Sequence, residues 1–190
     1  MPASAAVVAQ IPDERLHASG KAAAQDWVLP EQIVEKKEGR ALDNHLFCDA
    51  ENKFWTELNG WEKELLAAEM DKKDFVGWLR NFDRRDWSLC VPYDMGGIKG
   101  FYPDLIIIRK TSKGLIADIL EPHNPSFVDT VPKAIGLAKF ADEHGEEFGR
   151  IIIARKKGEH WQYADLQDKQ SRERIKAMQP GTDVAKLFEA

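Results

Sequence analysis

Runs of mainly apolar residues mark three strands in the second half of this chain. Residues 101–109 read F-Y-P-D-L-I-I-I-R, and residues 114–123 read G-L-I-A-D-I-L-E-P-H. A short polar connection, K-T-S-K, separates the two runs and is typical of a β-hairpin. Residues 150–155, R-I-I-I-A-R, have the character of a strand that is buried on both faces. The pattern therefore predicts a hairpin and a further buried strand.

Helical signals precede the hairpin. Asn59 is followed three residues later by Glu62, which is the spacing of a capping box at the start of a helix. Asp74 is expected to cap a second helical segment. Over residues 87–93, apolar positions alternate with more polar or smaller ones, and this alternation predicts a half-buried strand before the hairpin.

A longer helix is predicted over about residues 130–144, because Pro132 suits its first turn and Gly145 suits its end. A helix of this length between two apolar strands indicates a right-handed parallel crossover. The order helix, three-stranded meander, helix, strand predicts an α/β fold with a mixed (α+β) sheet and helices on its faces. The remaining elements expected are an edge strand and two C-terminal helices, at residues 161–163, 172–179 and 184–188.

Composition and charge are those of one domain with an extension. The 190 residues are 43% hydrophobic and 31% charged, which is enough for a single core. Residues 1–45 are predicted to form an N-terminal arm or linker, and residues 46–190 the domain. The net charge of −5 gives no overall attraction to nucleic acid, so a polyanion would need local basic residues. The candidates for such a surface are Arg155, Lys156, Lys157, Arg172, Arg174 and Lys176.

The sequence favours a cytoplasmic protein. Cys48 and Cys90 fit a reducing compartment better than a disulfide framework, and neither lies in a C-x-x-C pair of the kind that binds structural zinc. The first residues lack the basic leader of a secretory signal. No apolar run approaches the roughly 20 residues that cross a bilayer, so no membrane partner is expected.

Carboxylates within the apolar hairpin point to chemistry. Asp104 stands at the entry of the first strand, and Asp118 and Glu121 lie on the second. A carboxylate in an apolar run is unfavourable unless it is paired, and neighbouring carboxylates form a seat for a divalent cation with oxygen ligands. A turn around Ser112 would place Asp104 opposite Leu120, and strand alternation would place Asp118 and Glu121 on opposite faces. Either acid could therefore be the second ligand, and Asp118 could instead pair with a buried Arg or Lys.

Five segments together carry a family resemblance: W-L-R-N (78–81), W-S-L-C-V-P-Y (87–93), Y-P-D-L-I-I-I-R (102–109), D-I-L-E-P-H (118–123) and K-A-I-G-L-A-K-F-A (133–141). As a set they resemble the restriction-endonuclease-like PD-(D/E)xK domain at the C-terminal end of type III restriction-type and DEAD/DEAH-box helicase subunits. The resemblance covers about residues 55–190 and implies a restriction-endonuclease-like αβββαβ core with C-terminal helices. The chain has no G-x-x-x-x-G-K-[ST] phosphate-binding motif, so it is not expected to be the helicase motor itself.

The resemblance also implies a reaction, namely hydrolysis of DNA phosphodiester bonds with Mg²⁺ or Mn²⁺. DNA and a helicase motor domain or subunit would be the partners. Asp104 would be the first metal ligand, and Asp118 or Glu121 the second. A further acid is expected on the first helix, where Glu62 matches the family's position best and Glu57 and Glu64 compete with it.

The lysine of the family motif is absent, because Leu120 and His123 stand at the two positions expected for it. Lys133, near the start of the following helix, could substitute for that lysine, or His123 could carry the proton.

Two functions remain open at this point. The first is the nuclease domain of a helicase–nuclease system for restriction or repair. The second is a catalytically degenerate nuclease fold that serves a helicase as a DNA- or protein-docking module. The missing lysine and the acidic net charge favour docking, whereas the acids gathered at Asp104, Asp118 and Glu121 favour hydrolysis.

Overall fold

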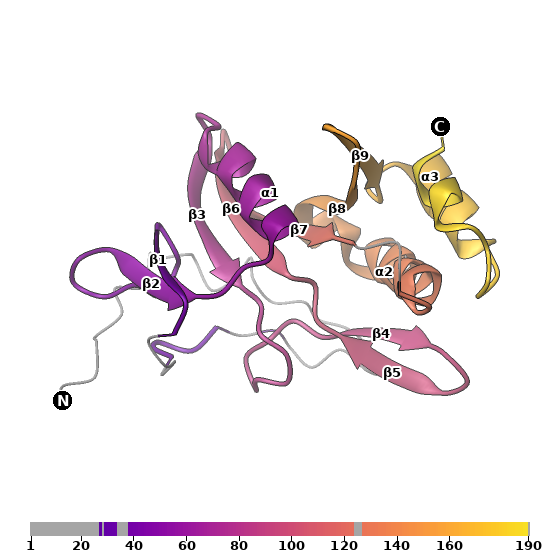
Figure 1. Ribbon diagram of the computed structural model, residues 1–190, viewed down its shortest axis with the longest axis horizontal. Helices are drawn as coiled ribbons and strands as arrows, with labels where there is room; N and C mark the ends of the chain where they lie inside the picture. Colours follow the sequence, from indigo (N-terminus) through magenta and orange to yellow (C-terminus); the bar gives the residue numbers. More distant parts are fainter. Residues whose placement is uncertain (1–26, 28, 34–37, 124–126, 190) are drawn as a thin grey trace.

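Five strands form one mixed sheet in the order β3-β6-β7-β8-β9 (Figure 1). The computed structural model describes residues 27, 29–33, 38–123 and 127–189. β6 and β7 form an antiparallel hairpin, and β8 joins β7 in parallel. The strands span Phe75–Arg80 (β3), Leu105–Thr111 (β6), Gly114–Pro122 (β7), Phe148–Lys157 (β8) and His160–Asp165 (β9).

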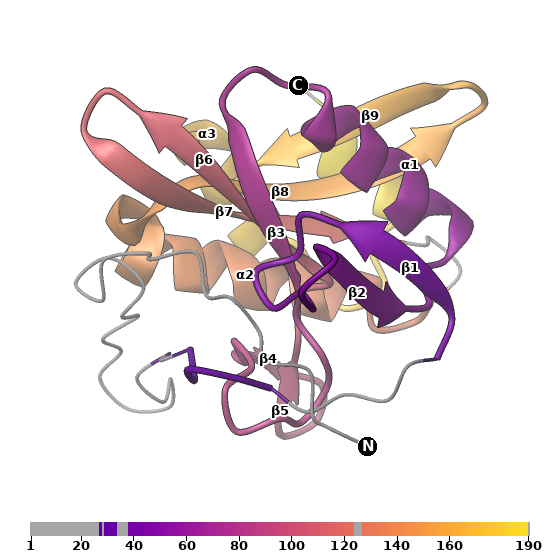
Figure 2. The same ribbon diagram turned by 90° about the vertical axis from the view of Figure 1, so that its left-hand side faces the viewer.

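Helices cover both faces of this sheet. α1 (Gly60–Met70) packs on one face of the sheet (Figure 2). On this face Leu65 and Leu66 of α1 meet Trp78 and Ile107 in a buried cluster. α2 (Thr130–His144) crosses from β7 to β8 on the other face, and α3 (Lys169–Lys176) packs beside it. Two 3₁₀ segments, Gly145–Glu147 (η2) and Val184–Phe188 (η3), follow α2 and α3.

Two small hairpins flank the sheet. The first joins β1 (Arg40–Asp43) to β2 (Lys53–Thr56), and the second joins β4 (Val91–Asp94) to β5 (Ile98–Phe101). β4 packs closely on α2, since a Cβ built at Gly136 would lie 2.5 Å from the Pro92 carbonyl oxygen. A glycine at this position therefore allows the helix and the hairpin to touch.

The predicted fold class is confirmed. α1, β3, β6, β7, α2 and β8 follow one another in the order helix, three strands, helix, strand, with the β4–β5 hairpin inserted after β3. The capping box at α1 is present as predicted, with Asn59 as the cap. α2 and β9 also form where they were expected, and the helix predicted over residues 172–179 begins three residues earlier, at Lys169.

Two predicted elements are wrong. Residues 75–80 form the edge strand β3 rather than a helix capped by Asp74, and Asp74 instead pairs with Arg109. Both faces of β3 are covered, so Trp78 and Leu79 are each fully buried, and an apolar pair of this kind does not distinguish a strand from a helix. Of the strand predicted over residues 87–93, only the end is extended, and it belongs to the β4–β5 hairpin outside the main sheet.

Part of the predicted N-terminal arm contributes to the core. Trp27 is buried, its ring lies 6.3 Å from that of Phe148, and its Nε1 donates a hydrogen bond to the Trp87 carbonyl. β1 also begins inside this segment. Residues 1–26 lie outside the described residues. In the part of the chain that the structure describes, no helix is long and apolar enough to cross a membrane.

Candidate functional site

A cavity of about 460 Å³ lies where β6 begins, β7 ends and α1 starts. Its lining includes Glu62 from α1, Asp104 from the entry of β6, Glu121 and His123 from the end of β7, and Lys133 from α2. Five of the six residues predicted for the site therefore meet at one place, although they come from four different parts of the chain.

The pairing of β6 with β7 decides which acid is next to Asp104. Leu105 is paired with Leu120, so Asp104 precedes the first pair on one strand and Glu121 follows it on the other. The backbone N–H of Asp104 donates a hydrogen bond of 2.9 Å to Oε2 of Glu121. The expected register, with Asp104 opposite Leu120, is wrong by one residue because the turn is centred between residues 112 and 113.

Asp118 does not reach this cavity. Its side chain is fully buried and paired with two arginines: Arg109 Nη2 lies 2.9 Å from Oδ1, and Arg150 Nη2 lies 2.6 Å from Oδ2. The main-chain N–H of Arg150 also donates to Oδ1. Of the two roles considered for Asp118, metal ligand or partner of a buried base, the geometry matches the second. Glu121 is therefore the acid that accompanies Asp104.

Arg80 bridges two carboxylates of the site, those of Glu62 and Asp104. Its Nη1 lies 3.2 Å from Oε2 of Glu62, and its Nη2 lies 3.2 Å from Oδ1 of Asp104. Glu62 is also held by the capping box, in which it accepts hydrogen bonds from the backbone N–H and the side-chain amide of Asn59. Arg80 was not predicted for the site. Because residues 75–80 were expected to be helical, no pattern in the sequence directed this side chain towards Asp104.

The environment of Asp104 disfavours its ionised form. Burial, followed by the negative charges of Glu121, Glu62 and Asp83, raises the pKa of Asp104 from 3.8 to about 8, even though Arg80 acts in the opposite direction. The larger causes are removal from water and like charge, both of which a bound cation would offset. Within the described residues, Oδ2 of Asp104 has no hydrogen-bond partner.

His123 and Lys133 close the cavity on the side of α2. His123 Nδ1 lies 3.1 Å from Oε1 of Glu121, and its Nε2 lies 2.7 Å from the hydroxyl of Thr130. Lys133 Nζ pairs with Asp129 at 2.9 Å. Burial alone would lower the pKa of Lys133, but the hydrogen bond to Asp129 and the charges of Asp129 and Glu121 raise it. The negative charge of Glu121 therefore helps to keep Lys133 protonated.

The other acids and bases predicted for function lie elsewhere. Glu57 and Glu64 do not line the cavity, and Glu64 pairs with Lys156 at 2.6 Å. Arg172 and Lys176 both pair with Asp142. Most of the predicted basic residues are thus engaged within the domain, and they do not gather around Asp104.

Oxygen donors at the cavity suit a hard divalent cation, because Asp104 and Glu121 are adjacent and carboxylates are preferred by Mg²⁺ and Mn²⁺. Glu121 is engaged through both oxygens, by the N–H of Asp104 and by His123. In the ranges described above, no three acidic, histidine or cysteine side chains form a metal-binding group. The donor chemistry fits a cation, and binding would require Glu121 to exchange a protein contact for the metal.

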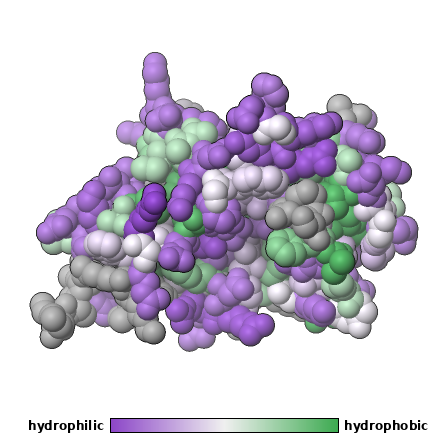
Figure 3. All heavy atoms as spheres, viewed as in Figure 1, coloured by the Kyte–Doolittle hydropathy of each residue, from purple (hydrophilic) through white to green (hydrophobic). Residues whose placement is uncertain are grey.

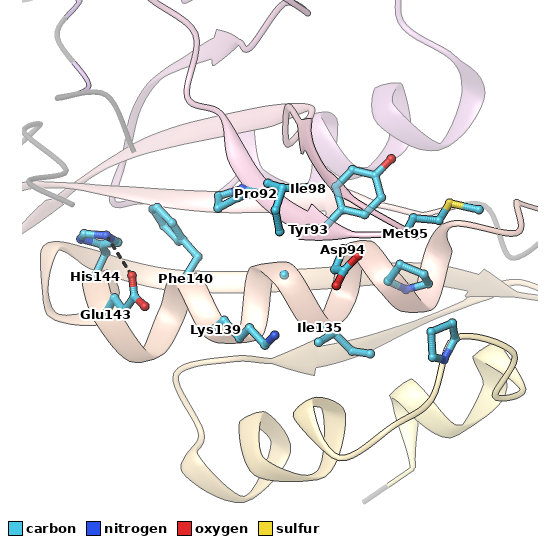
Figure 4. Close-up of a pocket in the computed structure, with 14 residues that line it drawn as sticks. Pro92, Tyr93, Asp94, Met95, Ile98, Ile135, Lys139, Phe140, Glu143 and His144 are labelled. Atoms are coloured by element: carbon cyan, nitrogen blue, oxygen red, sulfur yellow. Dashed lines mark ion pairs between the residues drawn. The ribbon is translucent and has the colours of Figure 1, made fainter. Parts of the chain in front are cut away.

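A second cavity, of about 670 Å³, lies between the β4–β5 hairpin and α2 (Figure 4). Tyr93, Ile135 and Phe140 give it a largely apolar lining. In Figure 3 hydrophobic residues show on the right of the molecule and in a second group on the upper left, and most of the remaining face is hydrophilic. Glu143 and His144 lie at one end of the cavity, where Nε2 of His144 is 3.9 Å from Oε2 of Glu143. None of the acids predicted for catalysis lies in this cavity.

Comparisons with known proteins place the chain in a family. A family model described as the YagJ family matches residues 43–190. Protein YagJ of Escherichia coli (strain K12) is 30% identical over 118 residues, which cover 60% of this chain and 49% of that protein. The chain therefore spans about half the length of the curated relative that it matches. No solved structure matches the chain.

Proposed function

The chain belongs to the YagJ family, and we propose that it is a nuclease-type domain that hydrolyses phosphodiester bonds of DNA with a divalent metal ion. The observation that carries this proposal is the meeting of Asp104, Glu121 and Lys133 in one cavity. Asp104 stands just before β6, Glu121 lies near the end of β7, and Lys133 lies in the first turn of α2. Two adjacent carboxylates with a nearby cation are what metal-assisted phosphoryl chemistry requires.

Asp104 and Glu121 would hold Mg²⁺ or Mn²⁺, and Glu62 would supply a further carboxylate at the edge of the cavity. When bound, the metal would lower the pKa of a coordinated water and neutralise charge on the phosphate. Lys133 would contact the phosphate and stabilise the charge that develops on it. His123, which shares its Nδ1 contact with Glu121, would orient that carboxylate.

Lys133 can take the place of the lysine that the motif lacks. It lies on α2 and not on β7, yet it lines the same cavity as both acids. Its charge interacts with that of Glu121. A lysine from the next helix would thus serve the same phosphate as a lysine two residues after the acid.

Cleavage of supercoiled plasmid in Mg²⁺ or Mn²⁺ tests the proposal. Wild type should nick the plasmid, and Asp104→Ala and Glu121→Ala should abolish nicking. Asp86→Asn, which changes an exposed aspartate outside the cavity, should leave it unchanged. Asp118→Asn gives a further contrast, because any effect it has should scale with loss of folded protein. Equal nicking by wild type and Asp104→Ala would show that the cavity is not the nuclease site.

A docking module that no longer cleaves is the second candidate, and Arg80 favours it. Its guanidinium lies 3.2 Å from Asp104 and 3.2 Å from Glu62, and so supplies the positive charge that a metal would otherwise provide. Calorimetric titration with Mn²⁺ separates the candidates. Metal binding that is lost in Asp104→Ala supports hydrolysis. A folded wild-type protein that binds DNA but neither binds Mn²⁺ nor cleaves supports docking.

A helicase motor is the partner that we propose for either candidate. The relative from Escherichia coli is about twice as long as the region it shares with this chain, so the activity of a complete protein could involve segments beyond it. Co-purification of the domain with a tagged helicase subunit from the same genome would test the partnership separately from catalysis.

A further inference from the structure

Three aromatic side chains, one from the first turn of α1 and two from β9, form a row. The ring centroids of Trp61 and Trp161 are 6.0 Å apart at an interplanar angle of 73°, and those of Trp161 and Tyr163 are 6.4 Å apart at 19°. Trp161 and Tyr163 alternate along β9, so both point to the face of the sheet that carries α1. Tyr163 is 51% exposed, and both tryptophans are partly exposed.

The row begins at the candidate site. Trp61 lines the same cavity as Asp104 and Glu121. A fourth aromatic side chain, Phe127, also lines this cavity and is 59% exposed. Aromatic surface therefore continues from the carboxylates, past the first turn of α1, to the outer strand β9.

These three rings are not needed to fill the hydrophobic core. The space between α1 and the sheet is already filled by Leu65, Leu66 and Trp78, all of them buried. Trp161 packs against this cluster but is only partly buried, and the exposed Tyr163 is not one of its members. Partly exposed rings of this kind are enriched where a protein binds other molecules, because they bury a large area with little loss of side-chain entropy.

The charges beside the row are too balanced to bind a duplex through its phosphates. Lys156 is paired with Glu64. Glu69 is paired with Arg150, and its negative charge adds to the effect of burial in raising the pKa of Tyr163. Glu159 and Asp165 add negative charge on and before β9, while Lys157 and His160 are exposed at the β8–β9 turn. Duplex binding depends on neutralising many phosphates, which a chain with a net charge of −5 and internally paired cations cannot do efficiently.

Stacking offers a source of affinity that these charges do not limit. Every unpaired base presents a π-face to an aromatic ring, and stacking of that base on the ring adds affinity whatever the base is. A duplex hides these faces between its base pairs. The combination of exposed rings, few free cations and continuity with the carboxylates therefore selects a strand whose bases are unpaired.

We propose that Trp61, Trp161 and Tyr163 form a stacking track that leads single-stranded nucleic acid into the cavity of Asp104 and Glu121. The direction of the track rests on the proposed function, because it takes that cavity as the place of reaction. The binding of unpaired bases to the three rings does not depend on metal or on cleavage.

Fluorescence anisotropy with a labelled oligothymidylate of about 12 nucleotides, in EDTA, measures the track alone. We expect wild type to bind this strand more tightly than a duplex of the same length. Tyr163→Ala and Trp161→Ala should each weaken single-strand binding by about tenfold, because each removes one stacked base. Trp161→Phe and Tyr163→Phe, which keep a ring, should retain most of the affinity.

Ile98→Ala is the matched control, because it shortens an exposed apolar side chain, 75% exposed, on the β4–β5 hairpin. It should bind the oligonucleotide like wild type. Tyr163 is the more exposed of the two β9 rings, so its variant should fold normally even if Trp161→Ala is destabilised. Quenching of tryptophan fluorescence by the oligonucleotide, reduced in Trp161→Ala, would report stacking directly.

Single-strand binding by folded Tyr163→Ala that equals wild type would overturn the proposal, and so would a wild-type preference for duplex. The proposed nuclease function fails separately. If the oligonucleotide binds to the track and no strand is cut in Mg²⁺ or Mn²⁺, the track stands and hydrolysis does not. If cleavage depends on Asp104 but is unaffected by loss of the rings, hydrolysis stands and the track does not.

Discussion

The backbone N–H of Asp104 donates a hydrogen bond of 2.9 Å to Oε2 of Glu121, across the junction between β6 and β7. This bond fixes the two carboxylates as neighbours at the mouth of a cavity, and it does so through the main chain. The position of Glu121 is therefore set by strand register, whereas the protonation of Asp104 is set first by its burial and then by the charges around it.

Divalent-ion affinity should rise with pH because Asp104 must lose its proton to bind a metal. Burial and the charges of Glu121 and Glu62 raise the pKa of Asp104 to about 8, so the ligand form is scarce near neutrality and increases up to about pH 9. Mn²⁺ titrations at pH 7 and pH 9 should show affinity rising by about tenfold. Asp104→Asn should bind weakly at both pH values. An affinity that does not change with pH would argue against Asp104 as a ligand.

The fold and the site differed in how far the sequence could predict them. Apolar runs identified β6, β7 and β8, because buried strands exclude polar residues. β3 was missed because its two faces are covered by different elements and the alternation that marks a strand is lost. Local pattern reports how a segment is buried, and it does not report which neighbours bury it.

The choice between Asp118 and Glu121 shows the same limit at the site. Both acids lie on the strand that was predicted, and strand alternation correctly put them on opposite faces. The pairing of β6 with β7, which differs by one residue from the expected register, places Glu121 next to Asp104. Arg109 on β6 and Arg150 on β8 pair with Asp118 and keep it away from the cavity. Contacts of this kind, between residues up to 32 positions apart, leave no mark on the local sequence.

His45 should make the protein less stable in mild acid. Removal of its imidazole from water by burial lowers the pKa of His45 from 6.5 to about 3, although the hydrogen bond with the Phe47 carbonyl acts in the opposite direction. Its Nε2 accepts a hydrogen bond from the backbone N–H of Arg80, and its ring stacks on Phe54. Below pH 6.5 the unfolded chain binds a proton that the folded chain does not. Stability is therefore complete above about pH 6.5 and is lost as the pH falls towards 3.

Urea unfolding at several pH values measures this loss. Between pH 6.5 and 4.5 the free energy of unfolding should fall by about 2–3 kcal/mol from this histidine alone. His45→Gln should be less stable at pH 7 and should show a flatter dependence on pH. His160→Gln, which changes an exposed histidine, should keep the wild-type slope. Parallel slopes for wild type and His45→Gln would contradict the assignment.

Asp118 should matter for folding and not for the site. Asp118→Ala leaves Arg109 and Arg150 without their shared buried partner, and breaking a buried pair of this kind costs about 3–5 kcal/mol. Urea unfolding should record that loss. Asp74→Asn, which weakens only the outer, half-exposed end of the same network, should cost about 1 kcal/mol or less. Equal effects of the two substitutions would mean that the inner pair is not the stabilising one.

Gly136 should be required for the β4–β5 hairpin to dock on α2. A methyl group there would lie 2.5 Å from the Pro92 carbonyl oxygen and 2.8 Å from Cβ of Tyr93, and a main-chain atom cannot move aside as a flexible side chain can. Gly136→Ala should therefore lower the free energy of unfolding by about 1–3 kcal/mol, the usual cost of overpacking. Hydrogen exchange should be faster in residues 91–101 than in β7.

Gly60→Ala is the control for this substitution. Gly60 is the first residue of α1, and a Cβ built there has no atom within 4 Å, so alanine should stabilise the protein by about 0.4–1 kcal/mol through the unfolded chain. The two changes are chemically identical and differ only in the space available. If Gly136→Ala were as stable as Gly60→Ala, the hairpin would have to move away from α2 at little cost. The cavity between hairpin and helix would then be adjustable rather than fixed by this contact.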